Sequence, residues 1–292
     1  MTKLFTGCGT ALVTPFRQDG SIDYEAYAGL VDRQMDKGVD FLVPVATTAE
    51  TPALTQDEKA RLLKITKEHA KGHRIIAGVG VNCVRDTLAN IKLLEPYGPD
   101  AFLVVVPYYN KPTQEGQYQY FKTVAAETSL PVIIYNVPGR TGANMLPDTV
   151  LRLAQDCPNI IGVKEASGNY SQVCEILRRA PKGFCVLSGD DDLTMALMAS
   201  GADGVISVAS NVAPAEVSEM VHAAMAEDYK SARALLYRLF PLFKGCFVES
   251  NPIPVKEALA QMGLCARTMR LPLVEASEET SRIIAGILAE LF

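Results

Sequence analysis

The chain has 292 residues, 48% of them hydrophobic and 21% charged, which is typical of a globular protein with one large domain or two small ones. Its formal net charge of −5 leaves no basic footprint, so nucleic acid is not expected as a partner. We also expect no secretory signal and no membrane span, because the N-terminus and the apolar runs lack the required patterns. The seven cysteines have no framework spacing, which indicates reduced thiols and a cytoplasmic protein.

Strand-like and helix-like segments alternate along the first 228 residues. Short apolar runs predict eight strands, at residues 7–16, 41–46, 75–80, 101–106, 132–137, 160–164, 185–188 and 204–209. Amphipathic segments predict a helix after each strand, at about residues 23–36, 55–71, 84–97, 114–128, 147–155, 171–179, 193–199 and 214–227. Pro44 weakens the second strand, because proline cannot donate to a ladder.

Eight strand–helix units imply an α/β fold with parallel strands and right-handed crossovers. Their number and spacing fit a (β/α)8 TIM barrel better than an open doubly wound sheet. No GxGxxG follows the first strand, which argues against a dinucleotide-binding fold. After about residue 228 only helices are predicted, at 231–247, 254–262 and 278–291. We therefore expect a barrel domain over residues 1–228 and a C-terminal helical extension over residues 229–292, packed on the barrel.

One lysine stands near the end of the sixth predicted strand. Lys164 follows an apolar run that is typical of a strand buried on both faces. Burial penalises the ammonium form and lowers the pKa, which is the state that Schiff-base chemistry on a carbonyl requires. The alternative is a lysine with a buried stem and a head that reaches solvent. Because catalytic groups of such barrels lie at the carboxyl ends of strands, the position favours a reactive lysine.

Hydroxyl groups and one arginine follow the other predicted strands. Thr47 and Thr48 come after the second strand, Tyr135 lies in the fifth, and Arg140 occupies the loop after it. Hydroxyls can move protons and an arginine fork can hold a carboxylate, which suits carbanion chemistry without a metal. Plainer interpretations stay open: a core tyrosine, a solvated arginine, and hydroxyls that only cap a loop.

Two further groups have structural interpretations. The pair Tyr108 and Tyr109 precedes a turn-like segment, where it could pack under a loop or contact another subunit. The run Asp190, Asp191 and Asp192 is typical of a helix N-cap with an acidic first turn. No set of strand ends carries the carboxylates or histidines of a metal site, so no metal or other cofactor is expected.

These motifs together resemble those of the dihydrodipicolinate synthases, a family of pyruvate-dependent class I aldolases related to the N-acetylneuraminate lyases. The matching segments keep the family's order and spacing over essentially the whole chain. They are Thr47-Thr48-Ala49-Glu50, Pro107-Tyr108-Tyr109-Asn110-Lys111-Pro112, Tyr135-Asn136-Val137-Pro138-Gly139-Arg140-Thr141-Gly142, Gly162-Val163-Lys164-Glu165, Gly189-Asp190-Asp191 and Asn251-Pro252-Ile253-Pro254-Val255-Lys256.

The resemblance implies a lyase that joins pyruvate to aspartate-4-semialdehyde in lysine biosynthesis. Lys164 would form the Schiff base and Tyr135 would move protons beside it. Thr48 would link Tyr135 to Tyr109, which would reach in from a neighbouring subunit of a homotetramer, a dimer of dimers. Thr47 and Thr48 would also hold the pyruvate carboxylate.

The same resemblance assigns the second substrate and the backbone around the lysine. Arg140 would bind the carboxylate of the semialdehyde, while Gly189 and Ile206 would contribute backbone contacts near the lysine.

Two alternatives to this function stay open. One is another Schiff-base aldolase, such as an N-acetylneuraminate lyase or a 2-oxo sugar-acid aldolase; the other is a non-catalytic barrel that binds a small oxo acid. Arg140 favours the synthase that acts on aspartate-4-semialdehyde over the other aldolases, because a small acidic aldehyde needs a fixed cation.

The chain departs from the family pattern in two places. Ala46 and Ala49 replace both glycines around the two threonines, and alanine tolerates positive φ poorly, so we expect the loop to adjust. Gln56 and Lys59 stand where lysine-inhibited members carry histidines that line the regulator site. Because Lys59 would repel a lysine ligand, we expect weak or absent inhibition by lysine.

Overall fold

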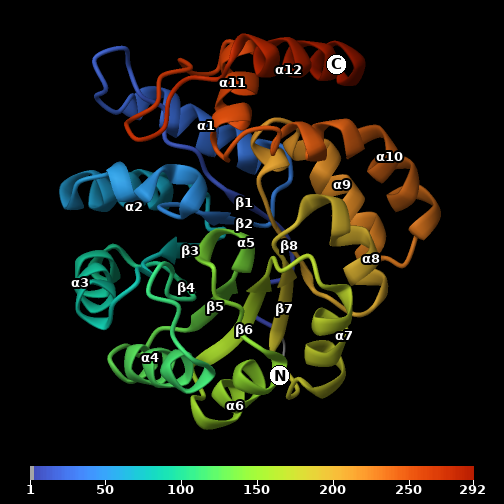
Figure 1. Ribbon diagram of the computed structural model, residues 1–292. Helices are drawn as coiled ribbons and strands as arrows, with labels where there is room; N and C mark the ends of the chain where they lie inside the picture. The colour runs from blue at the N-terminus through green and yellow to red at the C-terminus, as the bar shows by residue number, and fades with distance from the viewer. Residues whose placement is uncertain (1–2) are drawn as a thin grey trace.

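The computed structural model describes residues 3–292 and closes eight parallel strands into a barrel, with β8 paired back onto β1 (Figure 1). The predicted (β/α)8 fold with C-terminal helices is therefore confirmed. The strands are β1 (Gly7–Ala11), β2 (Phe41–Val43), β3 (Arg74–Gly78), β4 (Ala101–Val105), β5 (Val132–Asn136), β6 (Ile160–Glu165), β7 (Cys185–Ser188) and β8 (Gly204–Ser207).

Helices surround the barrel and continue past it to the C-terminus (Figure 1). Among the described residues, none of them combines the length and the hydropathy of a membrane span. They are α1 (Tyr24–Asp36), α2 (Gln56–His69), α3 (Val84–Leu94), α4 (Gln114–Ala126), α5 (Pro138–Thr141), α6 (Pro147–Asp156), α7 (Tyr170–Arg179), α8 (Thr194–Ala199), α9 (Pro214–Met225), α10 (Tyr229–Gly245), α11 (Ile253–Gln261) and α12 (Glu278–Leu291).

Several predicted strands were too long at their carboxyl ends. β1 ends at Ala11 rather than at residue 16, and β2 ends at Val43, directly before Pro44. Short 3₁₀ turns follow β2, β7 and β8, at Thr47–Ala49, Asp191–Leu193 and Ala209–Asn211. The short helix α5, which carries Arg140, was predicted as loop. These rim segments bend the chain away from the sheet, so their apolar residues are buried without being paired.

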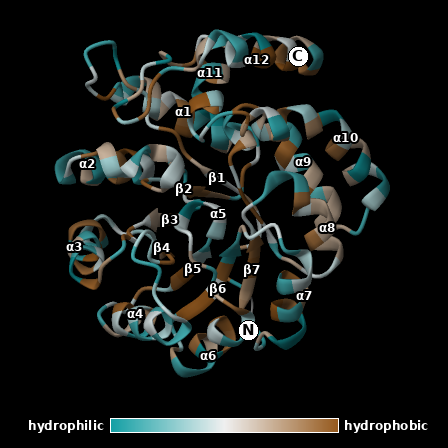
Figure 2. Cartoon of the chain, viewed as in Figure 1, coloured by the Kyte–Doolittle hydropathy of each residue, from teal (hydrophilic) through white to brown (hydrophobic). Residues whose placement is uncertain are grey.

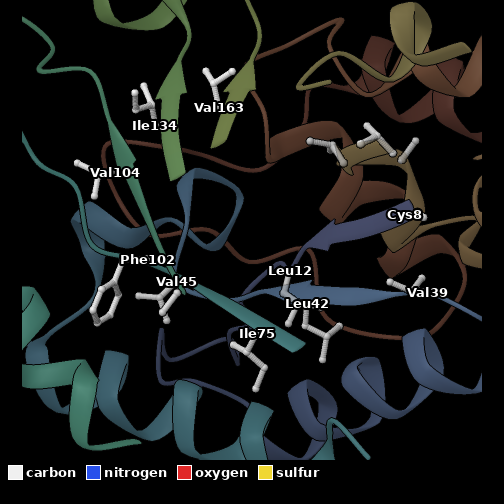
Figure 3. Close-up of a cluster of buried hydrophobic side chains, with 14 of the residues drawn as sticks. Cys8, Leu12, Val39, Leu42, Val45, Ile75, Phe102, Val104, Ile134 and Val163 are labelled. Carbon is white, nitrogen blue, oxygen red and sulfur yellow. The ribbon is translucent and has the colours of Figure 1, made fainter. Parts of the chain in front are cut away.

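The strands separate two apolar cores, one inside the barrel and one between barrel and helices. Side chains from alternate strand positions, such as Ile133 and Leu187, fill the inner core. Their neighbours fill the outer core, which includes Val104, Ile134 and Val163 (Figure 3). Figure 2 shows the result as hydrophobic strands inside a ring of helices whose outer faces are hydrophilic. Burial on both faces explains why the strands are continuous apolar runs.

One irregularity in the pairing of β5 with β6 determines which side chains point inward. Val132 pairs with Ile160, but the next residue, Ile133, pairs with Gly162, so β6 contains one extra residue. An extra residue on one strand shifts every later side chain to the opposite face relative to simple alternation. Beyond this shift Tyr135 pairs with Lys164, and both lie on the inner face.

The C-terminal helices attach to the barrel through a buried ion pair. Lys256 on α11 donates to Glu50 across 2.8 Å, and their side chains are 0% and 1% exposed. The same ammonium donates to the carbonyl of Thr268 at 2.7 Å, and the backbone N–H of Arg270 donates to Glu50 at 3.2 Å. The loop after β2 is thus tied to the C-terminal helices, although the domain boundary at residue 228 stays a prediction.

Replacing Lys256 with methionine should destabilise the protein by about 3–5 kcal/mol, because Glu50 is left as an unpaired buried charge. The double variant Glu50→Gln/Lys256→Met should regain most of that loss, since both charges are then gone. Chemical denaturation at one fixed protein concentration measures both. Lys64→Met provides the control, because its pair with Glu68 is long, at 3.9 Å, and exposed. Equal stability of the single and double variants would contradict this account.

Candidate active site

Lys164 and Tyr135 lie side by side inside the carboxyl end of the barrel. They are paired residues of β6 and β5, and the lysine Nζ lies 4.2 Å from the centroid of the tyrosine ring. Their exposed fractions are 5% and 7%, so both polar groups are almost removed from bulk water. The interpretation of Lys164 as a snorkelling lysine is therefore wrong, because its head remains inside.

Burial changes the protonation of both groups. Desolvation lowers the pKa of Lys164 to about 8, and Arg140 acts in the same direction, while Asp190 and Asp191 oppose it. At pH 7, about one Lys164 amine in ten is then neutral and nucleophilic. Burial raises the pKa of Tyr135 to about 12, so its hydroxyl keeps its proton and can donate it. A nucleophilic amine therefore stands next to a protonated phenol.

The two threonines after β2 point in different directions. Thr47 lies close enough to Tyr135 for its hydroxyl to lower the pKa of the phenol, against the larger effect of burial. Thr48 is 2% exposed, and its Oγ1 accepts a hydrogen bond from Asn251 Nδ2 at 3.0 Å. The described residues show no hydrogen bond from Thr48 to Tyr135, and the expected link between these two hydroxyls stays a prediction. Successive residues of a 3₁₀ turn point apart, so their order alone could not assign these partners.

The alanines around these threonines cause no strain. Ala46 has φ −101° and ψ −167°, which is extended backbone, and Ala49 ends the 3₁₀ turn without a positive φ. The positive φ values of this loop fall on Val45, at 55°, and on Glu50, at 56°. The loop therefore accommodates both alanines. It is held by Lys256, whose partner Glu50 occupies the left-handed position.

The C-terminal segment closes one side of the site through Asn251. Besides its hydrogen bond to Thr48, Asn251 accepts one at its carbonyl oxygen from Arg140 Nη2, at 3.2 Å. Asn251 itself is 5% exposed. The sequence analysis included Asn251 in a matching motif but gave it no function. Its position in the Asn-Pro-Ile-Pro motif was the one available signal.

Two adjoining cavities reach this group of residues. A cavity of about 50 Å³ is lined by Lys164, Tyr135, Arg140, Gly189 and both threonines. A larger one, of about 220 Å³, shares Tyr135 and Arg140 and extends to Tyr108 and Lys59. Arg140 is therefore the cation that the two cavities share, whereas Lys164 lines only the smaller one.

The two backbone positions expected near the lysine behave differently. A Cβ on Gly189 would lie 3.1 Å from Lys164 Cε and 2.5 Å from the Cβ of Ala166, so only glycine allows this close approach. Ile206 on β8 is fully buried in the inner core and lines neither cavity. Gly189 therefore borders the reactive amine, whereas the side chain of Ile206 packs the barrel interior.

The three consecutive aspartates have separate environments. Asp190 occupies the N-cap position of its 3₁₀ turn, but its side chain makes no capping hydrogen bond. Asp191 is buried and accepts from the N–H groups of Val208 and Ala209, so it caps the turn after β8. Asp192 pairs with Lys244. The predicted positions, an N-cap followed by an acidic first turn, are therefore confirmed, but the Asp190 side chain does not cap the turn and each carboxylate has a different neighbour.

Tyr109 stands apart from the other expected site residues. Its side chain is 86% exposed and its φ is +73°, while its backbone N–H donates to the carbonyl of Thr141. An exposed tyrosine in a left-handed conformation needs support from its surroundings.

Within residues 3–292, no three or more histidine, cysteine, aspartate or glutamate side chains group as metal ligands would.

The lowered pKa of Lys164 predicts the pH dependence of imine trapping. Only the neutral amine attacks a keto carbon, so trapping with pyruvate and borohydride should rise with pH and level off above about 8. Below that value the rate should fall about tenfold per pH unit. Quantitative mass spectrometry of the adduct on Lys164 measures it, with Lys164→Ala as the blank. A rate that still rises steeply above pH 9 would contradict a buried amine.

Comparisons with known proteins agree along the whole chain. The model of the dihydrodipicolinate synthetase family matches residues 4–291. The 4-hydroxy-tetrahydrodipicolinate synthase of Parabacteroides distasonis is 48% identical over 286 residues, which cover 98% of this chain and 96% of that protein. The enzyme of that name from Thermotoga neapolitana is 46% identical over 291 residues, covering 98% and 99%.

Solved structures give the same result in three dimensions. The dihydrodipicolinate synthase of Thermotoga maritima superposes with a TM-score of 0.96 at 44% identity, covering 99% of both chains. That of Aquifex aeolicus gives 0.95 at 44% identity, covering 98% of both. The sequence resemblance is thus confirmed, and the chain belongs to the dihydrodipicolinate synthetase family.

Proposed function

We propose that this protein is a lyase that condenses pyruvate with L-aspartate-4-semialdehyde to give 4-hydroxy-tetrahydrodipicolinate. The observation that carries the proposal is the buried pair of Lys164 and Tyr135, a nucleophilic amine next to a protonated phenol. The names of the relatives support the same reaction. Their high identity over nearly the full length argues against a sugar-acid aldolase or a non-catalytic barrel.

The chemistry begins at the lysine. The neutral amine of Lys164 adds to the keto carbon of pyruvate, and loss of water forms the imine. Loss of a methyl proton gives the enamine, whose carbon attacks the aldehyde of the second substrate. The amino group of that substrate then attacks the imine carbon, which forms the ring and releases Lys164. The hydroxyl of Tyr135 carries protons in these steps, because it lies beside the amine and remains protonated.

A hydroxyl relay connects Tyr135 to the outside of the site. Thr47, rather than Thr48, is the link that we propose, since Thr47 acts on the phenol while Thr48 is held by Asn251. Tyr109 completes the relay from a neighbouring subunit, which gives its exposed side chain a protein environment. This requires at least a dimer, and we propose the cytoplasmic homotetramer expected from the family.

The substrate carboxylates have separate binding positions. Thr47 and Thr48 line the small cavity beside Lys164, where the pyruvate carboxylate binds together with the backbone near Gly189. Ile206 belongs to the inner core and supports this region by packing. Arg140 binds the carboxylate of the semialdehyde, since it lines both cavities. Lys59 lines the larger cavity, so weak or absent inhibition by lysine stays our prediction.

Valine substitutions should separate the two threonines. Thr47→Val should lower kcat by about 10²-fold, because it breaks the proton relay. Thr48→Val should leave kcat nearly unchanged and raise the KM for pyruvate, and it should lower the unfolding free energy by about 1–3 kcal/mol, because it leaves the buried amide of Asn251 unpaired. Steady-state kinetics and denaturation of both variants measure these effects. If Thr48→Val lowered kcat strongly and Thr47→Val did not, the proton relay would run through Thr48 instead.

The function itself is tested by offering the enzyme two aldehydes with pyruvate. L-Aspartate-4-semialdehyde should be consumed, with formation of the cyclic product, because Arg140 binds a small acidic aldehyde. N-Acetylmannosamine should not react. A coupled reductase assay and mass spectrometry of the products report both, with Lys164→Ala as the inactive control. Turnover of the sugar alone would overturn the proposal.

A further inference from the structure

One cation and one anion flank the reactive amine. β5, β6 and β7 are neighbours in the barrel, and Lys164 lies on the middle strand. Arg140 follows β5 on one side, and Asp190 follows β7 on the other. Both line the cavity of about 50 Å³ that contains Lys164. The cavity therefore presents opposite charges across the position at which the aldehyde must meet the enamine.

No structural role accounts for the Asp190 carboxylate. Unlike Asp191 and Asp192, it takes part in no ion pair or side-chain hydrogen bond among residues 3–292 apart from an interaction with the backbone N–H of Gly168. Burial raises its pKa to about 6, with Lys164 opposing that rise, so it is ionised at neutral pH. A half-buried carboxylate with one backbone partner has the capacity to accept further hydrogen bonds from a cation.

We propose that Asp190 binds the α-ammonium group of the aldehyde substrate while Arg140 binds its α-carboxylate, so that the cavity selects a zwitterionic amino-acid aldehyde. The inference rests on the proposed function, since it concerns the second substrate of that reaction. It adds a determinant of specificity that the carboxylate-binding arginine alone does not supply. Arg140 would accept any small acidic aldehyde, whereas Asp190 favours one with an amino group, because only that group pairs with its charge.

The position of the ammonium also suits the last step. The amino group must reach the imine carbon on Lys164 to close the ring. Asp190 follows β7, the strand next to that of Lys164, and lies close enough to affect the pKa of the lysine. An ammonium bound at Asp190 is therefore held near the imine carbon, and once it has given up a proton the neutral amine can attack. Binding by Asp190 thus orients the substrate for cyclisation as well as selecting it.

The test compares Asp190→Asn with Asp192→Asn as the matched control. Asp192 belongs to the same turn but pairs with Lys244 and lines neither cavity. For Asp190→Asn we expect the KM for L-aspartate-4-semialdehyde to rise by about 10-fold or more, the effect of one lost charged hydrogen bond. The affinity of the pyruvate-loaded enzyme for succinic semialdehyde, which lacks the amino group, should change by less than about twofold. Asp192→Asn should behave as the unchanged enzyme with both aldehydes.

Borohydride trapping of pyruvate on Lys164 completes the experiment. Undiminished trapping in Asp190→Asn shows a folded site, and Asp190→Ser repeats the test if the first variant is unstable. The inference would be overturned if Asp190→Asn weakened the binding of both aldehydes equally or left the KM for L-aspartate-4-semialdehyde unchanged. Loss of trapping would also overturn it, by showing that Asp190 acts on Lys164 itself. Absence of semialdehyde turnover in the unchanged enzyme would instead reject the proposed function, so the two failures are distinguishable.

Discussion

The desolvation of one amine is the constraint on which the site depends. Lys164 is useful as a nucleophile because the barrel interior makes its charged form unfavourable, and that interior exists only because eight strands close on themselves. The same burial keeps the proton on Tyr135. One physical effect thus prepares two neighbouring groups in opposite senses, because losing the lysine proton removes a charge whereas losing the tyrosine proton creates one.

The charges around the amine moderate this effect. Asp190 and Asp191 raise the pKa of Lys164, so it remains near 8 rather than falling further. An amine of that pKa is neutral often enough to attack at physiological pH, and it can still be protonated when it has to leave. The glycine at position 189 matters here as well, because its missing side chain leaves room for the lysine stem.

The repeating pattern of the chain predicted the barrel, and the barrel rule placed Lys164, Tyr135 and Arg140 at the carboxyl ends of strands. The inward direction of Lys164 was beyond such reasoning. Simple alternation from Ile160, which packs in the outer core, would turn Lys164 outward as well, and only the extra residue in β6 turns it inward. Register depends on the pairing of two strands, which a single sequence does not display.

Contacts between distant segments were also hidden from the sequence. The partners of Thr48 and Glu50 are more than 200 positions away, at Asn251 and Lys256. No periodicity links such residues, so the contact between Thr48 and Asn251 became visible only in the structure. The family resemblance pointed to both threonines, but the direction of each hydroxyl depended on a turn of three residues.

The attachment of Asn251 and Lys256 has a consequence for the order of assembly during translation. During synthesis, Lys164 leaves the ribosome long before the segment that contains Asn251 and Lys256 has been made. The cavity beside that lysine is completed by Phe247 and Asn251, which belong to the late segment. The site is therefore assembled from parts of the chain that leave the ribosome more than 80 residues apart.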